Sequence, residues 1–231
     1  MGNVGDLGAF GAWLSDGANW TGRYGLLNLI VEHLALTALS LLIAALIAIP
    51  VGLFIGHTGR GEIFVVGLGS LSRAIPTMGL LFALVLLLGV EFRELSVLLA
   101  LSTIALPPLI AGAYSGVTTI PPSIRDSATA QGMTTWQLVR HVEVPLASPS
   151  LIGGLRIAFI QVVSTVVLAP LVGLGGLGFG IIQGLALRNY AQVTVSSLVI
   201  IVITITGERL IGFWQHRTKA RLTPLDKLEN P

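Results

Sequence analysis

The chain has 231 residues, of which 53% are hydrophobic and only 10% are charged, whereas soluble domains carry roughly 25% charged residues. This composition indicates an integral membrane protein and excludes an ordinary soluble domain. The net charge is only +2, with basic residues concentrated near the carboxyl end, which favours membrane topology over nucleic-acid binding. Without cysteine, the chain forms neither disulfides nor thiolate sites.

The amino-terminal segment, residues 1–28, precedes the first apolar stretch. It lacks the basic start and the unbroken apolar core of a cleavable signal peptide. Trp13, Trp20 and Tyr24 are interleaved with glycine and polar residues, a composition typical of a segment at the bilayer interface. A loose tail fits the same composition.

Five apolar stretches are long enough to cross a bilayer, which takes about 20 residues. They lie at 29–55, 64–90, 95–118, 148–171 and 192–214. The second contains Arg73 and Pro76, which predict a break near 74–76, and a re-entrant segment there would raise the count to six. We therefore expect an all-α integral membrane protein, with its transmembrane domain at 29–215 and a disordered polar tail at 216–231.

The basic residues predict the orientation, because Lys and Arg concentrate in cytoplasmic loops. Those on the side expected to be cytoplasmic are Arg60, Arg125, Arg140, Arg209, Arg217, Lys219, Arg221 and Lys227. The opposite loops hold only Arg23, Arg93 and Arg188. With five spans, the amino terminus is expected outside, and the carboxyl terminus and residues 119–147 in the cytoplasm.

That cytoplasmic loop carries a polar helix pattern. Asp126, Ser127 and Ala128 form a small-residue run with an acidic start, which suits the positive end of a helix beginning near Ser123. Small side chains there let another surface approach closely.

The second half of the loop predicts a bend and another short helix. Gly132 weakens the first helix or ends it in a left-handed turn. Thr134 or Thr135 can cap a second helix at 136–141, which Pro145 is expected to stop. The pattern is helix, bend, helix on a membrane surface.

The order Asp126-Ser127-Ala128, Gly132, Val142, Val144-Pro145 resembles the EAA loop of bacterial ABC-importer permeases. Asp stands for Glu, Ser for Ala, and Val for Ile and Leu, so size class or charge is kept. The resemblance extends over about 29–215. The phrases HLALTALSLLIAALIAIPVGL and GLGGLGFGIIQGL are most similar to the osmoprotectant branch, which imports glycine betaine, choline and carnitine.

The resemblance implies a permease subunit of the bacterial inner membrane, whose loop docks as a coupling helix in a groove of an ATPase. It implies as partners a dimer of ATPase subunits that binds ATP and Mg²⁺, a second permease subunit of the same or a related kind, an extracytoplasmic substrate-binding protein, and membrane lipid. The coupling residues would be Asp126, Ser127, Ala128, Gly132 and Pro145, with Arg140 and Glu143 as contacts at the rim. The chain itself has no G-x-x-x-x-G-K-[ST] phosphate loop, so we expect no cofactor on it.

Polar residues that interrupt the apolar spans are candidates for a translocation pathway, although Ser and Thr also hold transmembrane helices together. The candidates are Arg73, Pro76, Thr77, Thr103, Gln161, Ser164 and Thr165. Charge within a span is costly. Arg73 can line the pathway or satisfy carbonyls freed by Pro76, whereas Arg156 can reach the cytoplasmic surface or pair with an acidic residue of the loop or of a partner.

A glycine-rich run follows the fourth span. Gly173-x-Gly175-x-x-Gly178 matches the dinucleotide fingerprint, but that fingerprint requires a preceding strand. With Gly176, these glycines predict a tight non-helical turn on the outer side, which either lines a gate or simply connects two elements.

Other chemistries find little support. The four histidines lie on separate segments without metal-ligand spacing, so we expect no metal site and no enzyme. The chain is too poor in aromatic residues for the cage that binds trimethylammonium groups. A permease for an amino acid such as methionine remains the main alternative, because a passive channel or an intramembrane enzyme would leave the polar loop unexplained.

Overall fold

The computed structural model describes residues 7–63, 65, 67 and 76–226. These residues are almost entirely helical, and none of them forms a strand. They belong to two compact units. Unit 1 comprises residues 1–42, 75–102 and 159–206, and unit 2 comprises residues 43–74, 103–158 and 207–231. The long helices contribute to both units, so we describe each unit by itself.

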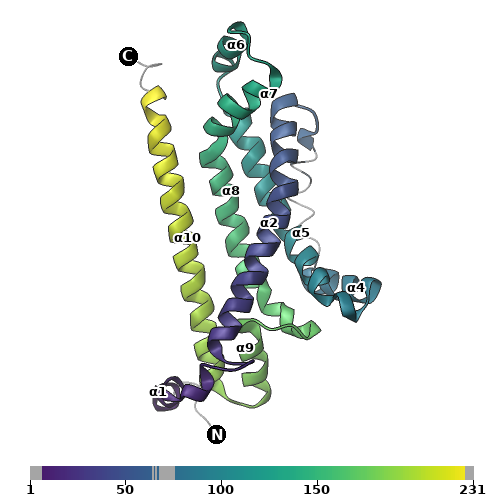
Figure 1. Ribbon diagram of the computed structural model, residues 1–231, viewed down its shortest axis with the longest axis vertical. Helices are drawn as coiled ribbons and strands as arrows, with labels where there is room; N and C mark the ends of the chain where they lie inside the picture. Colours follow the sequence, from purple (N-terminus) through teal and green to yellow (C-terminus); the bar gives the residue numbers. More distant parts are fainter. Residues whose placement is uncertain (1–6, 64, 66, 68–75, 227–231) are drawn as a thin grey trace. The chain divides into compact units, whose positions relative to one another are not determined.

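Figure 1 shows the helices in the order in which they follow one another along the chain. They are α1 (Leu7–Ser15), α2 (Leu26–Thr58), α4 (Thr77–Leu88), α5 (Arg93–Thr118), α6 (Pro122–Ala130), α7 (Thr135–Leu138), α8 (Val144–Thr165), α9 (Leu177–Ala186) and α10 (Tyr190–Asp226). A π-helical turn over Val139–Glu143 joins α7 to α8, and a 3-10 helix over Val166–Val172 follows α8.

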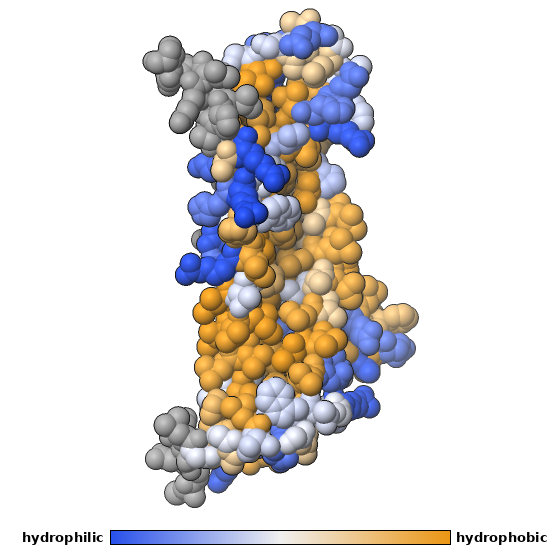
Figure 2. Space-filling model, turned by 60° about the vertical axis from the view of Figure 1, so that its left-hand side comes forward, coloured by the Kyte–Doolittle hydropathy of each residue, from blue (hydrophilic) through white to orange (hydrophobic). Residues whose placement is uncertain are grey.

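Four helical stretches among the described residues are long and apolar enough to cross a membrane: Leu26–Thr58, Val90–Thr118, Thr135–Val172 and Tyr190–Leu222. They confirm four of the five predicted spans. Within the predicted span at 64–90, the structure describes residues 65, 67 and 76–90, of which Thr77–Leu88 form the 12-residue helix α4. Arg73 and residues 74–75 of the predicted break lie outside the described residues. Large apolar side chains remain exposed on these helices, and they cover much of the face shown in Figure 2, as expected for contact with lipid.

The core of unit 1 is apolar. One cluster of its buried residues consists of Leu26, Leu29, Val163, Leu177, Val195 and Ile200. Two polar contacts lie beside them: Nε2 of the buried His33 is 3.1 Å from the carbonyl oxygen of Val163, and the Ser102 hydroxyl donates to the carbonyl of Ser40 over 3.0 Å. Backbone carbonyls thus serve two polar side chains of the long helices, whereas His33 Nδ1 and the Ser40 hydroxyl oxygen are buried without a hydrogen-bond partner among the described residues.

The amino-terminal segment is ordered around α1 in unit 1. The indole N–H of Trp20 donates to the carbonyl of Leu14 over 2.8 Å, and the Asn19 amide donates to that of Trp13 over 2.9 Å. These bonds fold the chain back onto α1, so the segment is not a loose tail over its described residues.

The helices of unit 2 approach one another at glycines. A Cβ built on Gly52 of α2 would lie 2.6 Å from the carbonyl oxygen of Ile110 on α5. A Cβ on Gly112 of α5 would lie 2.8 Å from the carbonyl oxygen of Ser150 on α8. Small residues at such crossings let backbones meet closely, as in many membrane helix pairs.

The carboxyl-terminal helix is longer than predicted. α10 runs to Asp226, past residue 216 at which the polar composition predicts a disordered tail. A long helix can carry a polar end when its apolar part already fixes the earlier turns.

Candidate functional site

The predicted coupling segment forms a helix, a bend and a second helix. α6 begins at Pro122, where proline is favourable because its missing N–H needs no partner in the first turn. Gly132 has φ +83°, in the left-handed region that favours glycine. Thr134 then caps α7: its backbone N–H donates to Gln137 Oε1 over 2.8 Å, and its hydroxyl oxygen accepts the Gln137 N–H over 3.4 Å. The predicted pattern is therefore confirmed.

The second helix does not stop at Pro145. The π-helical turn Val139–Glu143 leads directly into α8, which starts at Val144. Proline is tolerated there because it stands in the first turn of the helix, and the wider π-helical turn before it changes the hydrogen-bond register. The coupling segment is thus continuous with a membrane helix.

Exposure separates the predicted coupling residues into two groups. Asp126, Ser127 and Gly132 are exposed, and nothing lies within 4 Å of a Cβ built on Gly132. Ala128, in contrast, is buried within the chain. Arg140 and Pro145 are also exposed.

A groove of about 700 Å³ adjoins the same segment in unit 2. Its lining is mostly apolar and includes Leu53 and Phe54 of α2 and Trp136 of α7, with Arg140 at its polar part. Trp136 is 68% exposed. The sequence places this tryptophan in the loop but does not indicate that it borders a groove.

Glu143 differs from its predicted position at the rim, because its side chain is fully buried. Its two carboxylate oxygens both lie 3.0 Å from Nδ1 of His57, and Oε1 lies 3.3 Å from Nε of Arg125. A second nitrogen of Arg125 donates to the carbonyl of Val117. Burying a carboxylate is costly unless it is paired, and these contacts explain why Glu143 points inward.

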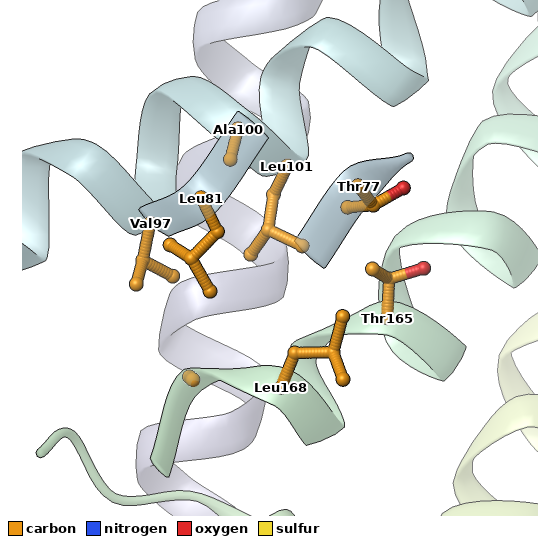
Figure 3. Close-up of a pocket in the computed structure, with 8 residues that line it drawn as sticks. Thr77, Leu81, Val97, Ala100, Leu101, Thr165 and Leu168 are labelled. Carbon is orange, nitrogen blue, oxygen red and sulfur yellow. The ribbon is translucent and has the colours of Figure 1, made fainter. Parts of the chain in front are cut away.

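Two of the predicted pathway residues meet in unit 1. Thr77 of α4 and Thr165 at the end of α8 line a small cavity of about 10 Å³, together with apolar residues of α5 and of the 3-10 helix. Figure 3 shows both threonine hydroxyls directed away from Leu81, Leu101 and Leu168. This cavity is too small for an organic solute, so it marks a closely packed contact between these elements.

The other pathway candidates are more dispersed. Gln161 and Ser164 are exposed on α8, and with Thr165 they share one face because residues three and four apart are neighbours on a helix. Pro76 is exposed and caps α4. Thr103 lies half-buried on α5 and belongs to unit 2, whereas the α8 set belongs to unit 1. The prediction for Arg73 falls outside the described residues.

The glycine-rich run forms the predicted turn, but its last glycine is helical. Gly173 and Gly176 have φ +80° and +91°, whereas Gly178 is buried in α9. The Gly176 N–H donates to Glu32 Oε2 over 3.0 Å, and a Cβ on Gly175 would collide with the same carboxylate. Glu32 is not among the predicted residues of the turn, because its partner Gly176 is 144 residues distant in the chain.

Arg156 pairs with an acidic residue, as one of the two sequence interpretations expects. The partner is Glu208 of α10 rather than a residue of the loop. Among the described residues, no group of three His, Asp or Glu side chains could hold a metal ion.

Comparison with known proteins identifies the family. Residues 48–223 match the model of the binding-protein-dependent transport system inner membrane component. The carnitine transport permease OpuCD of Listeria monocytogenes is 30% identical over 201 residues, 87% of each chain. The osmoprotectant import permease OsmW of Salmonella typhimurium is 30% identical over 202 residues, 86% of this chain and 92% of that one. The choline transport system permease OpuBD of Bacillus subtilis is 30% identical over 196 residues, 85% of this chain and 84% of that one.

Solved structures show the same fold. The inward-facing MetNI methionine ABC transporter matches with a TM-score of 0.69 at 25% identity, covering 84% of this chain and 95% of that one. An amino acid ABC transporter with histidines matches with a TM-score of 0.60 at 18% identity, covering 83% of this chain and 92% of that one. The chain therefore belongs to the family of binding-protein-dependent transport system inner membrane components, the non-catalytic permease subunits of ABC importers.

Proposed function

We propose that this permease imports a compatible solute such as glycine betaine, choline or carnitine, driven by a separate ATPase dimer that docks on α6 and α7. The names of the relatives support the solute class, because they are permeases for carnitine, osmoprotectants and choline. ATP and Mg²⁺ would bind to the ATPase subunits. The chain would form half of the pore, with a second permease subunit of the same or a related kind.

The observation that carries the docking proposal is the exposed surface of the coupling segment. Asp126, Ser127 and Gly132 are exposed on a polar helix and bend, which stand between spans that expose apolar side chains. A polar surface with small side chains lets a soluble partner approach closely, and the positive end of α6 attracts acidic groups.

A pull-down from native membranes tests the docking. We expect a Gly132→Trp variant to insert normally but to lose the ATPase that copurifies with the wild type. Gly22→Trp is the matched control, because Gly22 has φ +91° and equally open surroundings but lies outside the loop. Gly132→Ala shares the backbone strain without the bulk and should retain the ATPase. Retention by Gly132→Trp would contradict the docking surface, and mass spectrometry of the wild-type sample identifies the second permease subunit.

The second candidate substrate class is an amino acid. It is favoured by the structural match to a methionine transporter. Competition separates the two: we expect excess choline or carnitine to suppress uptake of labelled glycine betaine by cells that express the complete transporter. Suppression by methionine but not by choline would favour the amino-acid alternative.

The same proposal assigns residues to the translocation pathway and to the gate. The polar face of α8 formed by Gln161, Ser164 and Thr165 would line the route, with Pro76 and Thr77 at the start of α4. Their apolar surroundings suit weak, transient contacts with a passing solute. The glycine turn at 173–176 would border the outer opening, where an extracytoplasmic binding protein delivers the solute.

We infer from the basic loops that the amino terminus lies outside and the coupling segment in the cytoplasm. The chain has no cysteine, so single cysteines can be labelled without background. We expect a membrane-impermeant maleimide to label Ala18→Cys on intact spheroplasts, and Ser127→Cys only after lysis. Reversed labelling would invert the topology and contradict the coupling role of α6.

A further inference from the structure

A single buried carboxylate joins three segments of unit 2 that are distant in sequence. Glu143 lies in the π-helical turn before α8 and is fully buried. Nδ1 of His57, in the last turn of α2, is 3.0 Å from both carboxylate oxygens. Nε of Arg125, on α6, is 3.3 Å from Oε1. We call Glu143, His57 and Arg125 the Glu143 cluster; the carboxylate is fully buried, whereas the side chains of His57 and Arg125 are each 25% exposed.

Arg125 extends the cluster to a fourth helix. One of its terminal nitrogens donates to the carbonyl of Val117, one residue before the end of α5. Carbonyls in the last turn of a helix lack partners within the helix and carry partial negative charge, so a guanidinium is favourable there. The cluster therefore fastens α6 to the ends of α2 and α5 and to the segment that leads into α8.

The docking surface and this attachment lie on different sides of α6. Asp126 and Ser127 are exposed, whereas Arg125 turns toward the buried Glu143. An apolar contact can slide when one element is displaced, but separating a buried charge pair leaves an uncompensated charge. Moving α6 away from the ends of the membrane helices would therefore cost free energy.

We propose that Glu143 is a positioning residue for coupling: through Arg125 and His57, it makes α6 and the adjoining ends of α2 and α5 move as one body when the ATPase displaces the loop. This inference rests on the proposed function, because it requires an ATPase that docks on α6. It adds a role for a side chain that cannot itself reach the partner.

Spin labels on the two attached elements test the inference. Val51→Cys on α2 and Ser123→Cys on α6 are both exposed positions. Pulsed electron paramagnetic resonance measures the distance between them in the complete complex in nanodiscs, without nucleotide and after trapping with ATP and vanadate. We expect one narrow distance in both states with Glu143 intact, and a broader, shifted distribution after trapping in Glu143→Gln. The exposed Glu94 in the first turn of α5 provides the control Glu94→Gln, which should behave like the wild type.

A second variant separates positioning from stability. Replacing a buried ion pair by apolar residues of similar volume is often neutral or stabilising, so Arg125→Met with Glu143→Met should fold and retain the ATPase even if Glu143→Gln does not. If the charges position α6, this double variant still shows the shifted distance, and less glycine betaine enters per ATP hydrolysed. A narrow distance that does not change with nucleotide, in either variant, would overturn the proposal.

A failure of the proposed function can be distinguished from a failure of this inference. If the proposed function were wrong, no ATPase would copurify with the wild-type chain from the membrane. The nucleotide-free distance is therefore also measured on the permease alone, where Glu143→Gln should broaden the distribution relative to the wild type. An unchanged distribution there would contradict the cluster as an attachment, whatever the partner is.

Discussion

Each unit holds an irregular segment in place with a carboxylate, and the two carboxylates differ in their burial and in their partners. In unit 1, the half-buried Glu32 accepts the backbone N–H of Gly176 and the side-chain amide of Asn28, and none of the ion pairs between described residues involves it. In unit 2, the fully buried Glu143 is paired with Arg125 and His57. The first attachment can open at small cost, whereas the second resists separation.

This difference suits the two proposed roles. In the proposed function the glycine turn borders the outer opening, and loosely held segments are the ones that open locally. A segment that passes a displacement to membrane helices must instead remain attached to them. The comparison therefore predicts unequal responses to equivalent substitutions in the two units.

The largest effect is expected for Glu143→Leu. Removing one member of a fully buried ion pair typically costs about 3–5 kcal/mol because the other member is left uncompensated, and we expect the lower end of that range because the side chains of Arg125 and His57 are each 25% exposed. The free energy of unfolding, measured by titration with dodecyl sulfate and followed by circular dichroism, should fall accordingly. The exposed Glu94 gives the control Glu94→Leu, which should change little. If Glu32→Leu lowered the free energy of unfolding as much as Glu143→Leu, the two attachments would be equally strong. That result would contradict the predicted difference between the two units.

Gly154→Val should have the next largest effect. A Cβ on Gly154 would lie 2.5 Å from the carbonyl oxygen of Pro108, and that backbone atom cannot easily move away. Overpacking of this kind typically costs about 1–3 kcal/mol, which the same titration measures. Gly11→Val on α1 is the control, because nothing lies within 4 Å of a Cβ there. Equal stabilities of the two variants would mean that unit 2 is not closely packed at this crossing.

Sequence alone predicted the features that depend on neighbouring residues. The bend at Gly132 and the cap at Thr134 follow from local chemistry, so they could be read from the order of residues. Four of the membrane spans could be predicted for the same reason, because length and hydropathy are properties of a continuous stretch.

The features that were missed depend on contacts across the chain. Glu143 and His57 are 86 residues apart, and a charged residue in a polar loop is ordinarily exposed, so its burial had no local signal. α9 has only 10 residues and begins in a glycine-rich run, which made a turn the simpler expectation. Pro145 was predicted to end a helix because the sequence did not reveal the π-helical turn before it.

A moderate effect is expected for Glu32→Gln in unit 1. A hydrogen bond to a charged group contributes about 1.5–3 kcal/mol, and we discount this to about 1 kcal/mol because Glu32 is half-buried. A decrease of about 1 kcal/mol in the free energy of opening raises the population of the opened turn about fivefold. Leu174→Cys, a half-buried position in the turn, should therefore react about fivefold faster with a maleimide. The global free energy of unfolding should stay nearly constant, and a large decrease would show that the turn is not a locally opening segment.

The smallest effect is expected for Asn28→Ala. This substitution tests whether Asn28 must orient the Glu32 carboxylate for it to hold the glycine turn. The Asn28 amide donates to Glu32 Oε1 over 3.1 Å and to the carbonyl of Arg23 over 2.9 Å. An intramolecular hydrogen bond of this kind contributes only about 0.5–1.5 kcal/mol, and its loss near the surface falls at the lower end because water replaces the donor. Labelling of Leu174→Cys should rise about twofold, since Oε2 still accepts the Gly176 N–H. An effect as large as that of Glu32→Gln would mean that the turn depends on the whole series of hydrogen bonds from Asn28 through Glu32 to Gly176. The attachment in unit 1 would then be a network of hydrogen bonds rather than a single weak one.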